Sequence, residues 1–154
     1  MPEEVLATAS TKGGAWGNSP PEERTRRSIY MKSKRALSHP LMTDFDQADT
    51  DNSCPSRFST TVPTQALNFL NSKFLDDKAA LLARRLESEH PNDLPAQIRA
   101  GLQLVTQRAA RPEEMKQLLE LHETFRIRHQ NDPQSAFNRV CLTLLNLNEF
   151  LFLD

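Results

Sequence analysis

The chain has 154 residues, of which 38% are hydrophobic and 25% are charged, with a net charge of −1. This length suits one globular domain, and so small a charge gives no overall attraction to nucleic acid or to anionic membrane. The apolar stretches are shorter than the ~18 residues that a membrane-spanning helix needs. Residues 1–4 also lack the basic and apolar regions of a secretory signal. We therefore expect no nucleic-acid partner, no membrane insertion and no signal peptide in this chain.

Residues 1–62 are predicted to form an extended or irregular arm. They mix glycine and proline with polar residues and sustain no period of 2 or 3.6 residues. Residues 28–31 combine isoleucine with tyrosine, which predicts a short strand there, the only strand expected in the chain. Between residues 38 and 63, three prolines stand among Asp, Asn, Ser and Thr, a composition that favours turns.

Residues 63–154 are predicted to form a helical domain, so the fold class is mainly α, with about five packed amphipathic helices. Apolar residues recur at three- and four-residue steps from Pro63 onward, which places them on one helical face. The first of these stripes consists of Leu67, Leu70, Phe74, Leu75, Ala79, Leu82 and Leu86. Later helix starts, each marked by a capping side chain or an early proline, are expected at Ser72, Asp93 with Pro95, Arg111 with Pro112, and Asp132 with Pro133.

The last long helix is predicted to be the centre of the core, because its apolar face is the richest in the chain. That face consists of Phe137, Val140, Cys141, Leu144, Leu145 and Leu147. Cys141 is accordingly expected to be a buried free thiol. The alternative is a Cys54–Cys141 disulfide, which would require an oxidising compartment.

Metal, haem and nucleotide sites are not indicated. The two cysteines show neither haem nor zinc spacing. His122-Glu123 begins like a zinc-protease motif, but Arg126 stands where the second histidine ligand should be. The acidic run from Asp49 lacks the glycine and the final glutamate of a regular calcium loop, so only an irregular site is left open there. We predict no cofactor and no catalytic, cofactor-binding or metal-ligating residue.

A basic run between Arg24 and Arg35 contains no acidic residue. Its Arg26, Arg27, Lys34 and Arg35 are the candidate residues for an anion-binding or partner surface, since clustered cations can hold phosphates or other polyanions. Four aspartates follow between residues 44 and 51. The favoured interpretation is therefore that the two segments pair with each other or are solvated.

Several polar residues stand within apolar sequence: Gln65, Asn71, Asn146, Asn148 and Glu149. Such residues usually satisfy the backbone groups of helix ends and turns. The alternative is a site lined by amides and a carboxylate.

A series of short motifs in a fixed order resembles the planctomycete-type domain of unknown function 1553, over essentially the whole chain. The motifs are Ser19-Pro20-Pro21-Glu22-Glu23, Arg26-Arg27-Ser28-Ile29-Tyr30, Lys34-Arg35, His39-Pro40-Leu41, Phe45-Asp46, Ser53-Cys54-Pro55-Ser56-Arg57-Phe58, Pro63-Thr64-Gln65-Ala66-Leu67, Leu70-Asn71-Ser72 and Leu145-Asn146-Leu147-Asn148-Glu149-Phe150-Leu151.

This resemblance implies the C-terminal end of a longer exported protein, preceded by a companion domain and often by a cytochrome-c-like module. It implies an extracytoplasmic, periplasmic location but carries no catalytic role to any residue, because the family has no established activity. The leading hypothesis is a non-catalytic helical module, with a structural or interaction role, whose partner is the upstream domain of the same parent protein. The alternatives are an anion-binding module, or part of an enzyme site on an exported polysaccharide that uses Arg27, Asp46 or Glu149.

Overall fold

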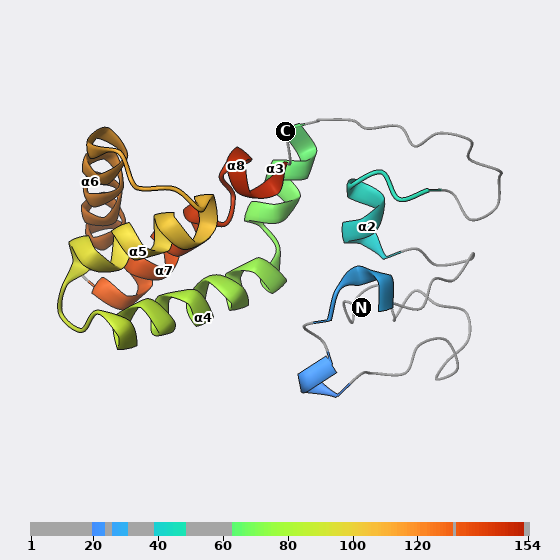
Figure 1. The fold of residues 1–154 in the computed structure, drawn as a ribbon, viewed down its shortest axis with the longest axis horizontal. Coiled ribbons are helices and arrows are strands. Elements are labelled where there is room, and N and C mark those ends of the chain that lie inside the picture. The colour runs from blue at the N-terminus through green and yellow to red at the C-terminus, as the bar shows by residue number, and fades with distance from the viewer. Residues whose placement is uncertain (1–19, 24–25, 31–38, 49–62, 131, 153–154) are drawn as a thin grey trace. The chain divides into compact units, whose positions relative to one another are not determined.

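The structure is a computed structural model, and it describes residues 20–23, 26–30, 39–48, 63–130 and 132–152 (Figure 1). The chain divides into two compact units, Met1–Thr61 and Val62–Asp154. Each unit is described by itself.

The described part of the first unit contains three short helical segments, η1 (Pro21–Glu23), η2 (Ser28–Tyr30) and α2 (Pro40–Asp44). Proline occupies the first position of α2, where its missing N–H is not needed. The carbonyl of His39 accepts hydrogen bonds from the Met42 and Thr43 amides at 2.9 and 3.0 Å, which closes the first turn. Local backbone bonds thus define this helix.

The predicted strand at residues 28–31 is wrong, because Ser28–Tyr30 forms one turn of 3-10 helix. The Tyr30 amide donates to the Arg27 carbonyl at 3.0 Å, so the bond that a strand would give to a neighbour is made within the turn. Among the described residues no strand occurs with which this segment could pair. Strand propensity is expressed only against a neighbouring strand, and here the local turn prevails.

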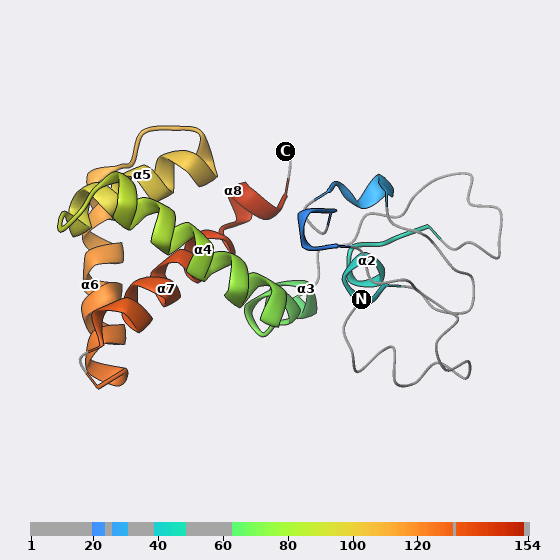
Figure 2. The same cartoon turned by 90° about the horizontal axis from the view of Figure 1, so that it is seen from below.

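The second unit is made of helices, which confirms the mainly-α prediction. Within its described residues, five longer helices are followed by a one-turn helix (Figures 1 and 2). Their bounds are α3 (Pro63–Leu70), α4 (Lys73–Glu89), α5 (Leu94–Thr106), α6 (Pro112–Arg128), α7 (Pro133–Leu144) and α8 (Asn148–Leu151).

The predicted helix starts lie where the local signals placed them. The Asp93 carboxylate accepts a hydrogen bond from the Ala96 amide at 3.0 Å, which caps α5. Asp132 caps α7 by accepting bonds from the amides of Gln134 and Ser135 at 3.1 and 3.3 Å. Ser72 stands at the predicted cap of α4, but its side chain makes no capping hydrogen bond.

The core is organised around α7, as predicted. This helix packs against α4, α5 and α6, and its Val140, Cys141 and Leu144 have no exposed surface. They meet fully buried side chains of α4 and α5, among them Leu86 and Ile98. Burial of such a side chain stabilises the fold by ~1.5–3 kcal/mol relative to exposure. The central helix therefore holds the others together.

A glycine allows the close approach of α5 to this core. A Cβ atom added at Gly101 would lie 2.9 Å from Cδ1 of Leu144 and 3.1 Å from Cδ1 of Leu86. Both leucines are fully buried, so each side chain would have to shift within the core to admit a Cβ atom. The absence of a side chain at residue 101 is thus part of the packing between three helices.

Candidate functional site

The predicted anion or partner surface is only partly described. Arg26 pairs with Glu23 at 2.9 Å, and its guanidinium lies over the Tyr30 ring at 5.8 Å from the centroid. Arg27 is exposed, whereas Lys34 and Arg35 lie outside the described residues. The anion-binding hypothesis therefore stays a prediction.

The three residues of the alternative enzyme site belong to different parts of the chain. Arg27 and Asp46 are in the first unit, and Glu149 is in the second. The proposal that these three side chains share one site stays a prediction.

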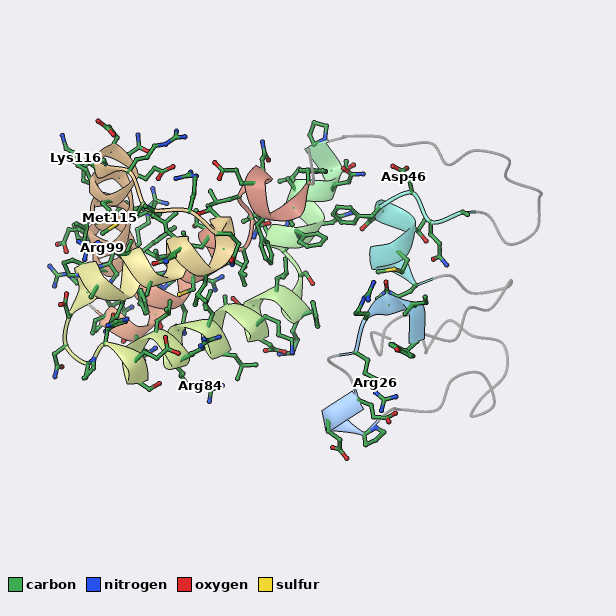
Figure 3. All side chains as sticks on the ribbon, in the orientation of Figure 1. Arg26, Asp46, Arg84, Arg99, Met115 and Lys116 are labelled. Atoms are coloured by element: carbon green, nitrogen blue, oxygen red, sulfur yellow. The ribbon has the colours of Figure 1, made fainter. Side chains whose placement is uncertain are left out.

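Figure 3 labels Arg26 and Asp46 in the first unit, and Arg84, Arg99 and Lys116 in the second. The exposed cations of the second unit are spread over α4, α5 and α6.

The densest charged group in the second unit is the Arg108 cluster, which consists of Arg108, Glu114 and Glu149. Arg108 follows the end of α5, and its guanidinium binds Glu149 through Nε and Nη2, both at 2.9 Å. The same guanidinium donates to Glu114 in the first turn of α6, at 2.9 and 2.5 Å. Glu114 also accepts the Arg111 amide at 2.9 Å and so caps α6. One arginine thereby joins α5, α6 and α8.

Hydrogen bonds from arginine set the ionisation of both carboxyl groups. The bonds from Arg108 and from the Arg111 amide lower the pKa of Glu114 to about 2. The Arg108 bonds lower the pKa of Glu149 as well, while the two carboxylates raise the pKa of Arg108. Bidentate bonding to a carboxylate favours the charged form of each partner. Both acids are ionised at neutral pH, and the cluster serves the fold in a way that needs no substrate.

His122 joins α6 to the start of α7. It is a buried histidine whose ring lies 6.5 Å from that of Phe137 in an edge-on arrangement. Burial lowers its pKa, although a hydrogen bond with the Pro133 backbone opposes that shift. Arg126, which stands where a zinc-protease motif would have its second histidine, is hydrogen-bonded to Glu123 at 2.6 and 2.8 Å. His122 therefore acts as a packed structural residue.

Cys141 is a free thiol with no exposed surface, as predicted. Burial is the main cause that raises its pKa to about 12, and the charge of Glu87 adds to it. A thiol with so high a pKa is a poor nucleophile. Its predicted alternative partner, Cys54, lies outside the described residues.

The polar residues embedded in apolar sequence serve different purposes. Asn146 donates to the Leu142 carbonyl at 2.8 Å, at the end of α7, which confirms the structural interpretation for this residue. Gln65 is buried at 2% exposure on the inner face of α3. Asn71 and Asn148 are exposed, and Glu149 belongs to the Arg108 cluster. The backbone N–H of Asn71 donates a hydrogen bond to the Leu67 carbonyl at 3.0 Å.

The first predicted apolar stripe is only partly buried. Leu75, Ala79 and Leu86 are in the core. Leu67, Leu70 and Phe74 are instead 55%, 44% and 51% exposed, and we call these three residues the α3–α4 apolar segment. Leu67 and Leu70 share a face of α3 because they are three residues apart. Phe74 follows in the first turn of α4, with Lys78 over its ring at 5.4 Å.

The described ranges show neither a metal-binding cluster nor a membrane-spanning helix. No group of three or more His, Cys, Asp or Glu side chains there could hold a metal ion. None of the described helices is both long enough and apolar enough to span a membrane.

Comparison with known proteins gives a family. A family model labelled PSD1 and described as "Protein of unknown function (DUF1553)" matches residues 3–122. The chain belongs to the DUF1553 family. The DUF1553 match runs through the first unit and the second as far as α6, and the predicted closing motif at residues 145–151 lies beyond it. No curated protein and no solved structure matches this DUF1553 chain.

Sequence reasoning missed the Arg108 cluster. Glu114 was visible as a helix-start residue and Glu149 as a polar residue in apolar sequence, but Arg108 carries no motif. Arg108 and Glu149 are 41 residues apart, so their contact depends on how α5 and α8 pack. Opposite charges at that separation give no local signal.

Proposed function

We propose that this DUF1553 chain provides a non-catalytic interaction module that packs against an upstream domain of the same parent protein. The observation that carries the proposal is the exposure of the α3–α4 apolar segment. Three large apolar side chains within eight residues of sequence, each between 44% and 55% exposed, are a cost to an isolated module. The same surface favours association when a partner covers it.

The charged residues of the second unit support an interaction role over a catalytic one. The shifted pKa values of Glu114, Glu149 and Glu123 each arise from an ion pair with an arginine of the same unit. That of His122 arises from burial. Structural ion pairs and burial shift pKa values in this way without any catalytic role.

The family resemblance supplies the proposed setting. We place the module at the C-terminal end of a longer, exported protein, in an extracytoplasmic compartment. The proposed partner is the companion domain that precedes this segment in longer family members, and it should present an apolar surface to α3 and the start of α4.

The test is thermal unfolding of the chain with the upstream domain of a longer family member added in trans. A partner that binds only the folded module raises the melting temperature in a concentration-dependent way. The double variant Leu67→Ser with Phe74→Ser should remove most of that rise, since the apolar contact is lost.

The matched control is Ile127→Ser. Ile127 is a 66% exposed apolar residue on α6, and the helix α6 lies away from α3 in both views (Figures 1 and 2). This variant should keep the full rise in melting temperature. An unchanged melting temperature of the wild-type chain at saturating upstream domain would refute the proposal, and so would equal loss in both variants.

A further inference from the structure

The one-turn helix α8 depends on side-chain contacts for its position. It lies beside the C-terminal end of α5 (Figures 1 and 2). Its backbone contributes few bonds, since Phe150 and Leu151 donate to the Leu147 carbonyl at 2.9 and 3.1 Å and Phe152 donates to Asn148 at 2.9 Å. A single helical turn is not stable by itself in water. The contact between α8 and the rest of the unit therefore decides whether this turn stays formed.

Within the Arg108 cluster, Glu149 of α8 is more exposed and has fewer hydrogen-bond donors than Glu114 of α6. Glu114 has a 26% exposed side chain and a second donor, the Arg111 amide. Glu149 has a 52% exposed side chain and, among the described residues, hydrogen-bonds through it to Arg108. If Glu149 leaves, Arg108 keeps its two bonds to Glu114. Separation of α8 from α5 thus creates no unpaired buried charge, which is the main cost of breaking an ion pair inside a protein.

We propose that α8 is a reversible latch on the C-terminal end of α5. The Glu149–Arg108 pair holds it closed, and it opens while α4, α5, α6 and α7 remain folded. Opening frees Leu147, which packs against the core from its partly buried position, together with the end of α5 that α8 contacts. The charged groups that face Glu149 are Arg108 after α5, Arg111 just before α6, and Glu114 on α6.

Amide hydrogen exchange of the complete chain tests the latch. The Phe150, Leu151 and Phe152 amides should exchange far faster than the interior amides of α7, as expected for a local opening. Glu149→Gln should accelerate these three amides by about twofold to fivefold, which is the range for an exposed ion pair. Rates are to be corrected for the intrinsic effect of the substitution. The α7 amides and the melting temperature should not change.

Glu89→Gln is the matched control. It removes the exposed Arg85–Glu89 pair, 2.7 Å long, from α4, and it should leave exchange in α8 unchanged. Three results would overturn the latch. These are α8 amides as slow as those of α7, no acceleration by Glu149→Gln, or equal acceleration by Glu89→Gln.

Discussion

Single side chains show how tightly the second unit is packed. Gly101→Ala should destabilise the fold although alanine is the better helix former. The helix-propensity gain is ~1 kcal/mol, whereas overpacking of a filled core costs ~1–3 kcal/mol. The added methyl would lie 2.9 Å from Leu144 and 3.1 Å from Leu86. We expect a net loss of about 1 kcal/mol, measured by urea unfolding.

Leu144→Val supplies the check on that mechanism, because valine lacks the Cδ1 atom that the new methyl would meet. The double variant with Gly101→Ala should be more stable than the sum of the two single changes predicts. Simple additivity would show that the loss does not come from this contact.

Gln130→Gly should stabilise the chain. Gln130 lies two residues after the end of α6 and has φ of 54°. This left-handed conformation costs an L-residue ~1 kcal/mol and costs glycine almost nothing. We expect a gain of ~0.5–1 kcal/mol in urea unfolding. Asn92→Gly is the comparison, because Asn92 has φ of 59° but asparagine tolerates this region. A gain at Asn92 that exceeds the gain at Gln130 would contradict the argument.

His122 should make stability depend on pH in a defined direction. Burial lowers its pKa from the ordinary value of 6.5, so the unfolded chain binds a proton more readily than the folded chain. Stability is therefore complete above pH 6.5 and falls as the pH drops below it. In urea unfolding between pH 7.5 and 5, His122→Gln should show a flatter decline than the wild type. Identical slopes for the two proteins would rule out this role.

At the scale of elements, local signals predicted the helices better than the contacts between them. Asp93 and Asp132 predict the starts of α5 and α7, because a capping carboxylate accepts hydrogen bonds from amides only two or three residues further along the chain. The expected strand at residues 28–31 failed, because strand propensity needs a neighbouring strand and a local turn does not. Periodicity placed the residues of the α3–α4 apolar segment on a helical face, but it shows only that a face is apolar and not what covers it.

The candidate site residues show the same difference between local signals, which were predictable, and long-range contacts, which were not. The burial of Cys141 could be foreseen from its apolar neighbours, whereas the bond of Glu149 to Arg108 could not, because packing alone brings α8 to α5. The prediction that Asn146 satisfies a helix end is confirmed, because its hydrogen bond to the Leu142 carbonyl spans only four residues. Contacts between residues close in sequence can be predicted from the sequence, whereas ion pairs between residues far apart in sequence cannot.

At the scale of the whole molecule, a helical unit of the DUF1553 family combines a well-packed centre with an exposed apolar segment at its start. The core around α7 explains how the unit folds. The exposure of Leu67, Leu70 and Phe74 is the feature that folding alone does not explain. An interaction with an upstream domain would give this segment its purpose.

Hydrogen–deuterium exchange of the chain, with and without that upstream domain, is the most direct test of this interaction. Binding of the upstream domain should add protection in α3 and the first turns of α4 and leave α6 unchanged. Protection confined to α6, or no change in any helix at saturating partner, would contradict it.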